Sequence, residues 1–90
     1  MMISEKDKRK IRNIAKKYKA GKVILFGSGC DPTAVSNDID LAVEGVPDAQ
    51  FFKFYSELIF SLSKPVDIFD LRKKQKFRDV ILAEGLILYG

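Results

Sequence analysis

The sequence contains no histidine, and Cys30 is the one cysteine among its 90 residues. Without histidine, Ser-His-Asp and Cys-His catalysis, histidine-ligated zinc and imidazole acid–base chemistry are excluded. A single cysteine excludes a framework of internal disulfides. Any catalysis therefore depends on carboxylates, lysines, hydroxyl groups or a metal ion bound by oxygen.

Long apolar runs are also missing from the sequence. No run approaches the roughly 18 residues of a membrane-spanning helix. Charge begins at Glu5, which argues against a secretory signal, so we expect a cytoplasmic protein with no membrane contact. The length, with 47% hydrophobic and 31% charged residues, predicts a single globular domain over residues 1–90.

Basic and acidic residues are unevenly distributed along the chain. The formal charge is +4, and nine of the 16 basic residues precede position 23. Residues 23–52 contain no lysine or arginine but five acidic residues. An acidic middle between basic flanks suits a site that gathers cations and meets a polyanion, although charged residues on helices are often merely solvated.

The first helix is predicted from its start signal and its apolar spacing. Ser4 and Asp7 resemble a capping box, and Gly21 is expected to end the helix. Direct nucleic-acid binding through this basic helix is disfavoured because it lacks interleaved aromatic residues on its polar face. Its apolar face consists of Ile11, Ile14, Ala15 and Tyr18.

Two further helices follow. Asp48 is expected to cap a helix over about 49–63, which has a broad apolar arc and places Phe60 on its far side. We expect Phe60 to contribute to contact with a partner or a second copy, although one exposed phenylalanine is also ordinary. The last helix ends at Gly85.

Short runs of β-favouring residues alternate with these helices. Strands are predicted at 22–26, 38–43 and 66–69, and 86–89 is a terminal strand or an extended tail. Residues 31–37 are predicted to form a loop. The order predicts an α/β fold of the α+β kind, in which helices pack against a small mixed sheet.

Aspartates occur inside two of these strands, where charge is unfavourable. Asp38 and Asp40 are two residues apart, so they share one face of the pleat, while Ile39 and Leu41 point into the core. Asp67 interrupts the later strand in the same way. If the two strands are neighbours, all three carboxylates lie on one surface.

Three carboxylates on one surface would repel one another. Two unit charges about 4 Å apart repel by about 4 kcal/mol at an effective dielectric constant near 20. A divalent cation removes the conflict, and oxygen ligands favour Mg²⁺ or Mn²⁺ over zinc. The alternative is that Asp38 belongs to a turn while Asp40 and Asp67 lie on a solvated edge of the sheet.

A glycine–serine pair follows the first predicted strand. At Gly27 the backbone could approach a phosphate closely, and successive N–H groups with the Ser28 hydroxyl could bind its oxygens. The pair does not match a P-loop, and an ordinary turn is the alternative.

These segments together resemble the DNA polymerase β-type nucleotidyltransferase superfamily, and more closely its minimal nucleotidyltransferases, which are often paired with a helical HEPN-domain protein. The resemblance covers nearly the whole chain and implies a polymerase β-like fold. The similar segments are Val23–Ser28, Asn37–Val43, Pro65–Phe69, Phe77–Gly85 and Leu86–Tyr89.

The resemblance implies a reaction and the roles of five residues. Asp38 and Asp40 would hold two Mg²⁺ ions, and Asp67 would ligate the second ion and accept the proton of the incoming hydroxyl. Gly27 and Ser28 would hold the β- and γ-phosphates of ATP. AMP would then pass from ATP to a hydroxyl group, with pyrophosphate leaving.

The resemblance also implies a partner. AMP would be transferred to a tyrosine of a HEPN-type protein, the two proteins acting as toxin and antitoxin. Two departures leave an alternative: the segment between Ser28 and Asp38 is shorter than is usual in the family, and Gly29-Cys30 replaces its usual residues. The alternative is an inactive or weakly active module that neutralises its partner by binding. A homo-oligomer also remains open.

Overall fold

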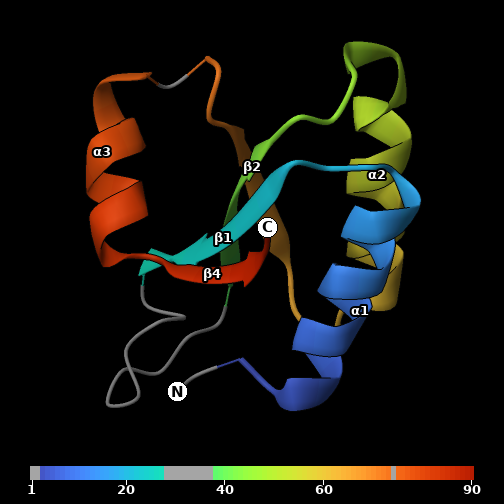
Figure 1. Cartoon of the computed structure of the whole chain (residues 1–90). Coiled ribbons are helices and arrows are strands. Elements are labelled where there is room, and N and C mark those ends of the chain that lie inside the picture. The colour runs from blue at the N-terminus through green and yellow to red at the C-terminus, as the bar shows by residue number, and fades with distance from the viewer. Residues whose placement is uncertain (1–2, 28–37, 74) are drawn as a thin grey trace.

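In a computed structural model, the chain forms a mixed sheet with helices packed on both of its faces (Figure 1). The structure describes residues 3–27, 38–73 and 75–90. The elements are α1 (Glu5–Lys17), β1 (Lys22–Phe26), β2 (Ile39–Glu44), α2 (Asp48–Ser61), β3 (Val66–Asp70), α3 (Gln75–Glu84) and β4 (Leu86–Tyr89). The predicted small mixed sheet with helices packed against it is confirmed, and 86–89 is a strand rather than a tail.

The four strands lie in the order β3-β2-β1-β4. β1 pairs antiparallel with β2 and with β4, whereas β2 and β3 are parallel. Parallel neighbours need a crossover connection, which α2 provides here. α1 and α2 lie on one side of the sheet and α3 on the other (Figure 1). No helix in the described ranges is long and apolar enough to cross a bilayer.

Alternation along the strands divides the core between the two faces. In β1, Val23 and Leu25 join the larger cluster, which includes residues of α1 and α2. Ile24 between them joins a smaller cluster with Ala42 and with Ile81 of α3. The sheet therefore has one extensively packed face and one face with a small apolar cluster.

The start of α1 is as predicted, but its end is not. The Ser4 side chain accepts a hydrogen bond from the Asp7 N–H, so Ser4 caps the helix. The helix ends at Lys17, and Lys19 takes the left-handed conformation with φ 57°. The prediction that Gly21 ends the helix is wrong, because a non-glycine residue reverses the chain earlier.

The prediction that Asp48 caps α2 is also wrong. Pro47 is at the cap position and makes no side-chain capping bond, while Asp48 is the first helical residue. The Asp48 carboxylate accepts a hydrogen bond from Arg72 at 2.9 Å. Of the broad apolar arc only Phe54 and Leu58 are buried within the helix itself.

Two side-chain bonds tie α1 to distant parts of the fold. Ser63 donates a hydrogen bond to the Asp7 carboxylate at 2.6 Å, and Asp7 is buried. At the outer edge of the sheet, the Arg12 Nε donates to the Leu88 carbonyl of β4 at 2.9 Å. The basic helix is thereby attached both to the segment after α2 and to an edge strand.

We expect Ser63→Ala to lower the free energy of unfolding by about 1–2 kcal/mol, because it leaves a buried carboxylate without its hydroxyl donor. Urea denaturation measures the change. Asn13→Ala, on the exposed side of α1, is the control and should change stability by less than about 0.5 kcal/mol. Equal effects of the two variants would contradict the assignment.

Candidate active site at one end of the sheet

The strand register brings the predicted site residues to one end of the sheet. Phe26, the last residue of β1, is opposite Asp40 in the antiparallel pair. Asp40 is in turn opposite Asp67 in the parallel pair. The neighbouring strands that the sequence analysis required are therefore present, and Asp40 occupies the central position. Asp38 directly precedes β2, which begins at Ile39 and not at Asp38 as predicted.

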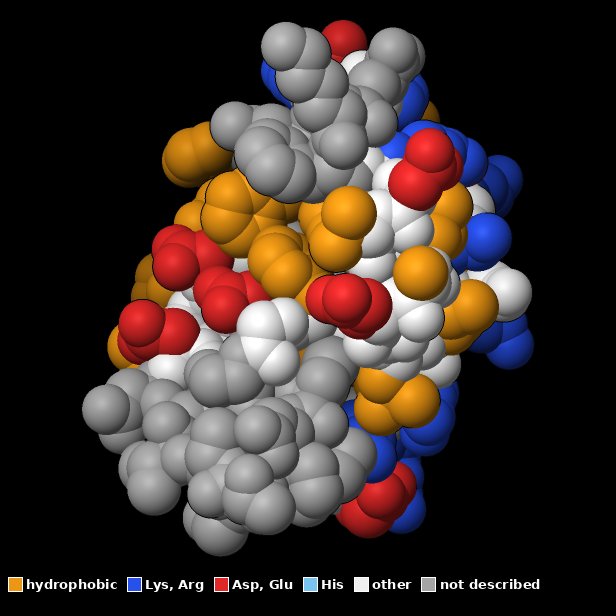
Figure 2. Space-filling model, turned by 90° about the vertical axis from the view of Figure 1, so that its left-hand side faces the viewer, with side chains coloured by type: hydrophobic (Ala, Val, Ile, Leu, Met, Phe, Trp, Pro, Cys, Tyr) orange, Lys and Arg blue, Asp and Glu red, His pale blue; other side chains and the backbone are white. Residues whose placement is uncertain are grey.

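These carboxylates belong to the face of the sheet on which α3 lies. Ala42, two residues after Asp40, is part of the smaller core, and Ile39 and Leu41 are buried in the larger core as predicted. Phe26 and Phe69, from the two flanking strands, meet edge to face at 5.3 Å between ring centres. Figure 2 looks onto this side and shows acidic side chains gathered beside hydrophobic ones.

Gly27 is required by its conformation and by its closeness to Asp40. Its φ of 72° is in the left-handed region, and a Cβ there would be 2.7 Å from Asp40 Oδ2. Glycine thus lets the backbone turn directly beside the carboxylate. Ser28, the other predicted phosphate-binding residue, lies outside the described residues, as do Gly29, Cys30 and the predicted loop 31–37.

The three aspartates interact electrostatically. Burial raises the pKa of the Asp40 carboxyl, and the charges of Asp67 and Asp38 raise it further. Asp38 and Asp67 are exposed, whereas Asp40 is half-buried. The folded chain therefore bears an unfavourable concentration of negative charge centred on Asp40.

The chemistry of this group suits a hard divalent cation. Its donors are carboxylate oxygens, which Mg²⁺ and Mn²⁺ prefer, and a cation would offset the repulsion of Asp40 by Asp67 and Asp38. Across the described ranges, no three His, Cys, Asp or Glu side chains already form a compact metal-ligating group. The three aspartates, Asp38, Asp40 and Asp67, are thus neighbours. Their role as ligands of a metal ion remains a prediction.

Asp70, the other acid of β3, belongs to a separate network. Burial alone would raise its pKa, but hydrogen bonds from Arg72 outweigh burial and lower the pKa. The Arg72 guanidinium also binds Asp48. Asp70 is thus engaged in an ion pair with Arg72.

α3 and the end of β1 form a hollow beside Gly27 that no sequence pattern marked. The hollow has a volume of about 310 Å³ and is lined by Phe26, Gly27, Val80, Ile81 and Glu84. Val80 is apolar but half exposed. Nothing in the sequence distinguishes Glu84 from an ordinary solvated acid on a helix.

Comparison with known sequences gives one family match. A family model described as "Polymerase beta, Nucleotidyltransferase" matches residues 9–90. A search of curated proteins finds no match.

Several solved structures share the fold. A toxin–antitoxin structure with AMP-PNP is 27% identical with a TM-score of 0.71, over 92% of this chain and 73% of that chain. A mutant MntA–HepT toxin–antitoxin structure with two aspartate-to-glutamate substitutions is 25% identical with a TM-score of 0.72, over 92% and 73% of the two chains.

A third structure contains a tri-AMPylated HEPN toxin of Shewanella oneidensis in complex with an MNT antitoxin. It is 24% identical with a TM-score of 0.66, over 93% of this chain and 70% of that chain. At this identity the likeness shows the fold alone.

We expect Asp67→Asn to raise the free energy of unfolding at pH 7 by about 0.2–1 kcal/mol, because it removes a like charge directly opposite Asp40. Because the pKa of Asp40 is raised in the folded chain, this carboxyl contributes stability at pH values below its ordinary pKa of 3.8. That contribution is lost as the pH rises through the folded-state pKa. The gain should therefore shrink as the pH falls toward 3.8.

Urea denaturation across this pH range, in buffer containing a chelator of divalent cations, measures the effect. Asp79→Asn, which removes an exposed acid of α3, is the control. Loss of stability in Asp67→Asn at pH 7 would show that Asp67 makes favourable contacts that outweigh the repulsion.

Proposed function

Because the chain belongs to the polymerase beta nucleotidyltransferase family, we propose that it transfers AMP from ATP to a hydroxyl group in the presence of Mg²⁺. The acceptor is a tyrosine of a HEPN-type partner, and the two proteins form a toxin–antitoxin pair. A relative at 27% identity is a toxin–antitoxin structure with AMP-PNP, an ATP analogue, which supports both the donor and the biological setting.

One structural observation carries the proposal. Asp40 is opposite Asp67 in register, and the Gly27 backbone is so near that a Cβ on it would be 2.7 Å from Asp40 Oδ2. A nucleotidyltransferase needs acidic ligands for cations and a close backbone approach for a polyphosphate at the same place. This end of the sheet brings both features together.

Each site residue has a distinct role in the proposal. Asp38, Asp40 and Asp67 would hold two Mg²⁺ ions, which neutralise the triphosphate and stabilise the attacking and leaving oxygens. Gly27 and Ser28 bind the β- and γ-phosphates through N–H and hydroxyl groups. Asp67 also accepts the proton of the tyrosine hydroxyl as its oxygen attacks the α-phosphorus and pyrophosphate departs.

The exposure of the carboxylates agrees with these roles. Asp67 is exposed and can reach an incoming hydroxyl, whereas Asp40 is half-buried between its neighbours and can act as the shared ligand. The charges of Asp67 and Asp38 repel that of Asp40, and a bound cation would relieve this repulsion.

We expect AMP-PNP with Mg²⁺ to bind the chain, and Asp40→Asn to weaken that binding by about 10-fold or more, because it removes the central ligand. Isothermal titration calorimetry measures the affinity. Asp79→Asn should bind as the unmodified chain does. If AMP-PNP does not bind the unmodified chain with either Mg²⁺ or Mn²⁺, the nucleotide site is absent.

Transfer itself is tested with ATP radiolabelled in its α-phosphate, Mg²⁺ and a HEPN-type protein encoded beside the chain. Label should appear on the HEPN-type protein, and Asp40→Asn should reduce the rate by about 100-fold or more. Tyrosine-to-phenylalanine variants of the partner identify the acceptor. Tight binding without label would instead favour a module that neutralises its partner by binding alone.

A further inference from the structure

The outward side of α2 carries two large aromatic side chains. Phe52 is 81% exposed and Phe60 is 89% exposed, with Ser56 midway between them in the helix. Four-residue spacing places the three on one stripe. This stripe is on the opposite side of the helix from the buried Phe54 and Leu58. Phe52 and Phe60 therefore add nothing to the core.

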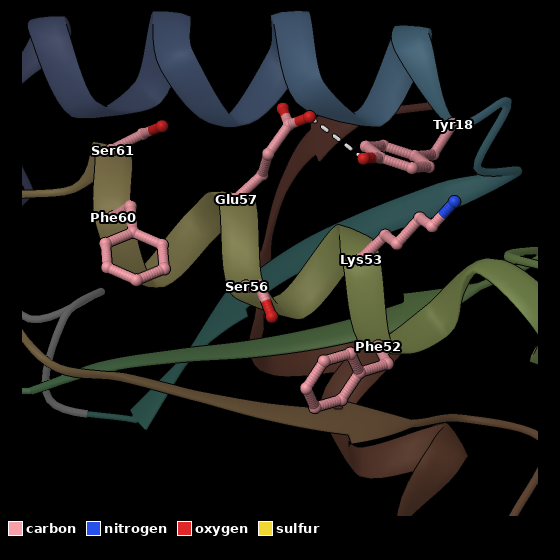
Figure 3. A pocket seen from close by; sticks show the side chains of 7 residues that line it. All are labelled: Tyr18, Phe52, Lys53, Ser56, Glu57, Phe60 and Ser61. Carbon is pink, nitrogen blue, oxygen red and sulfur yellow. Dashed lines mark hydrogen bonds between the residues drawn. The ribbon is translucent and has the colours of Figure 1, made fainter.

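The stripe borders a groove between α2 and the end of α1. The groove has a volume of about 360 Å³, and Figure 3 shows Tyr18 and Lys53 toward one end and Phe60 with Ser61 toward the other. Tyr18 is fixed in the groove wall, because its ring packs edge-on against Phe54 at 5.8 Å between ring centres. The small Ser56 leaves room between the aromatic side chains for an incoming apolar group.

The charges around this groove are mostly positive. Its one carboxylate, Glu57, accepts hydrogen bonds from Lys17 at 2.5 Å and Tyr18 at 2.9 Å, and these bonds lower the pKa of Glu57. Lys10, at the far end, donates to the Ser61 carbonyl. Among the described residues, no carboxylate pairs with Lys53. The groove thus presents aromatic surface with unneutralised ammonium groups beside it.

A second copy of the chain is a poor occupant for this groove. The α2 of a second copy has no free carboxylate to offer these lysines, because its Glu57 is bonded to Lys17 and Tyr18 and its Asp48 to Arg72. An amphipathic helix with acidic residues beside its apolar stripe matches both the aromatic side chains and the lysines.

We propose that this groove docks an acidic amphipathic helix of the partner. The inference rests on the proposed function, which supplies a HEPN-type helical protein as that partner. Apolar side chains of the docked helix insert between Phe52 and Phe60 over Ser56, and its carboxylates pair with Lys53 and Lys10.

The groove is on the opposite side of the sheet from the candidate active site. α1 and α2 cover the face of the larger core, whereas Asp40 shares its face with Ala42 and α3. A helix docked on α2 therefore leaves Gly27 and the aspartates open to nucleotide. Partner docking and nucleotide binding therefore use separate surfaces, so a substitution in one surface should abolish one kind of binding and leave the other intact.

The test measures, by calorimetry, the affinity of the full chain for a HEPN-type protein encoded beside it. Phe60→Asp and Phe52→Asp should each weaken binding by about 10-fold or more, since exposed aromatic anchors dominate such contacts. Lys53→Glu should weaken binding and reduce its dependence on salt. Ile87→Asp, which places the same charge at a half-exposed apolar position of β4, is the matched control and should bind normally.

Two further measurements separate this proposal from the proposed function. Phe60→Asp should still bind AMP-PNP with Mg²⁺, and Asp40→Asn should still bind the HEPN-type protein. Unchanged partner affinity in both phenylalanine variants, or no complex at all, would overturn the docking proposal. It would also be overturned if the unmodified chain is a dimer in sedimentation and Phe60→Asp makes it a monomer, because a second copy then occupies the groove.

Discussion

The repulsion between Asp40 and Asp67 is the constraint on which the functional face depends. The parallel register of β2 and β3 holds these two residues opposite each other. Slipping one strand by a single residue would turn Asp67 toward the larger core and bring Ile68 to the site. The buried neighbours Ile39 and Val66 oppose such a slip, so packing on one face fixes the chemistry of the other.

The division of the sheet into two faces separates stability from function. The larger core, between the sheet and α1 and α2, contains most of the fully buried side chains. Among the described residues, the opposite face has a small cluster beneath α3, beside carboxylates that destabilise one another. Local destabilisation of this kind is characteristic of ligand-binding sites. It is tolerated because selection requires a threshold of stability rather than a maximum. The extensive packing behind the sheet offsets that cost.

Much of this fold could be predicted because its signals are local. Strand alternation correctly assigned Ile39 and Leu41 to the core and Asp40 to the opposite face. That β2 and β3 are neighbours was only a condition in the sequence analysis, since no residue within either strand specifies its neighbour. The end of α1 and the cap of α2 were predicted wrongly because contacts and conformations outside the local sequence pattern decide them. Lys19 adopts a conformation that favours glycine, and Asp48 binds Arg72 across the fold instead of capping α2.

The Arg12 bond to Leu88 has a consequence for self-assembly. β4 is an edge strand with apolar side chains exposed at Leu86 and Ile87, and edges of this kind recruit strands from other molecules into aggregates. Here the Arg12 guanidinium donates to the Leu88 carbonyl of this strand and brings a positive charge to it. A foreign strand would have to displace that side chain first. One arginine of the basic helix thus leaves this edge with one free carbonyl fewer for pairing with another strand.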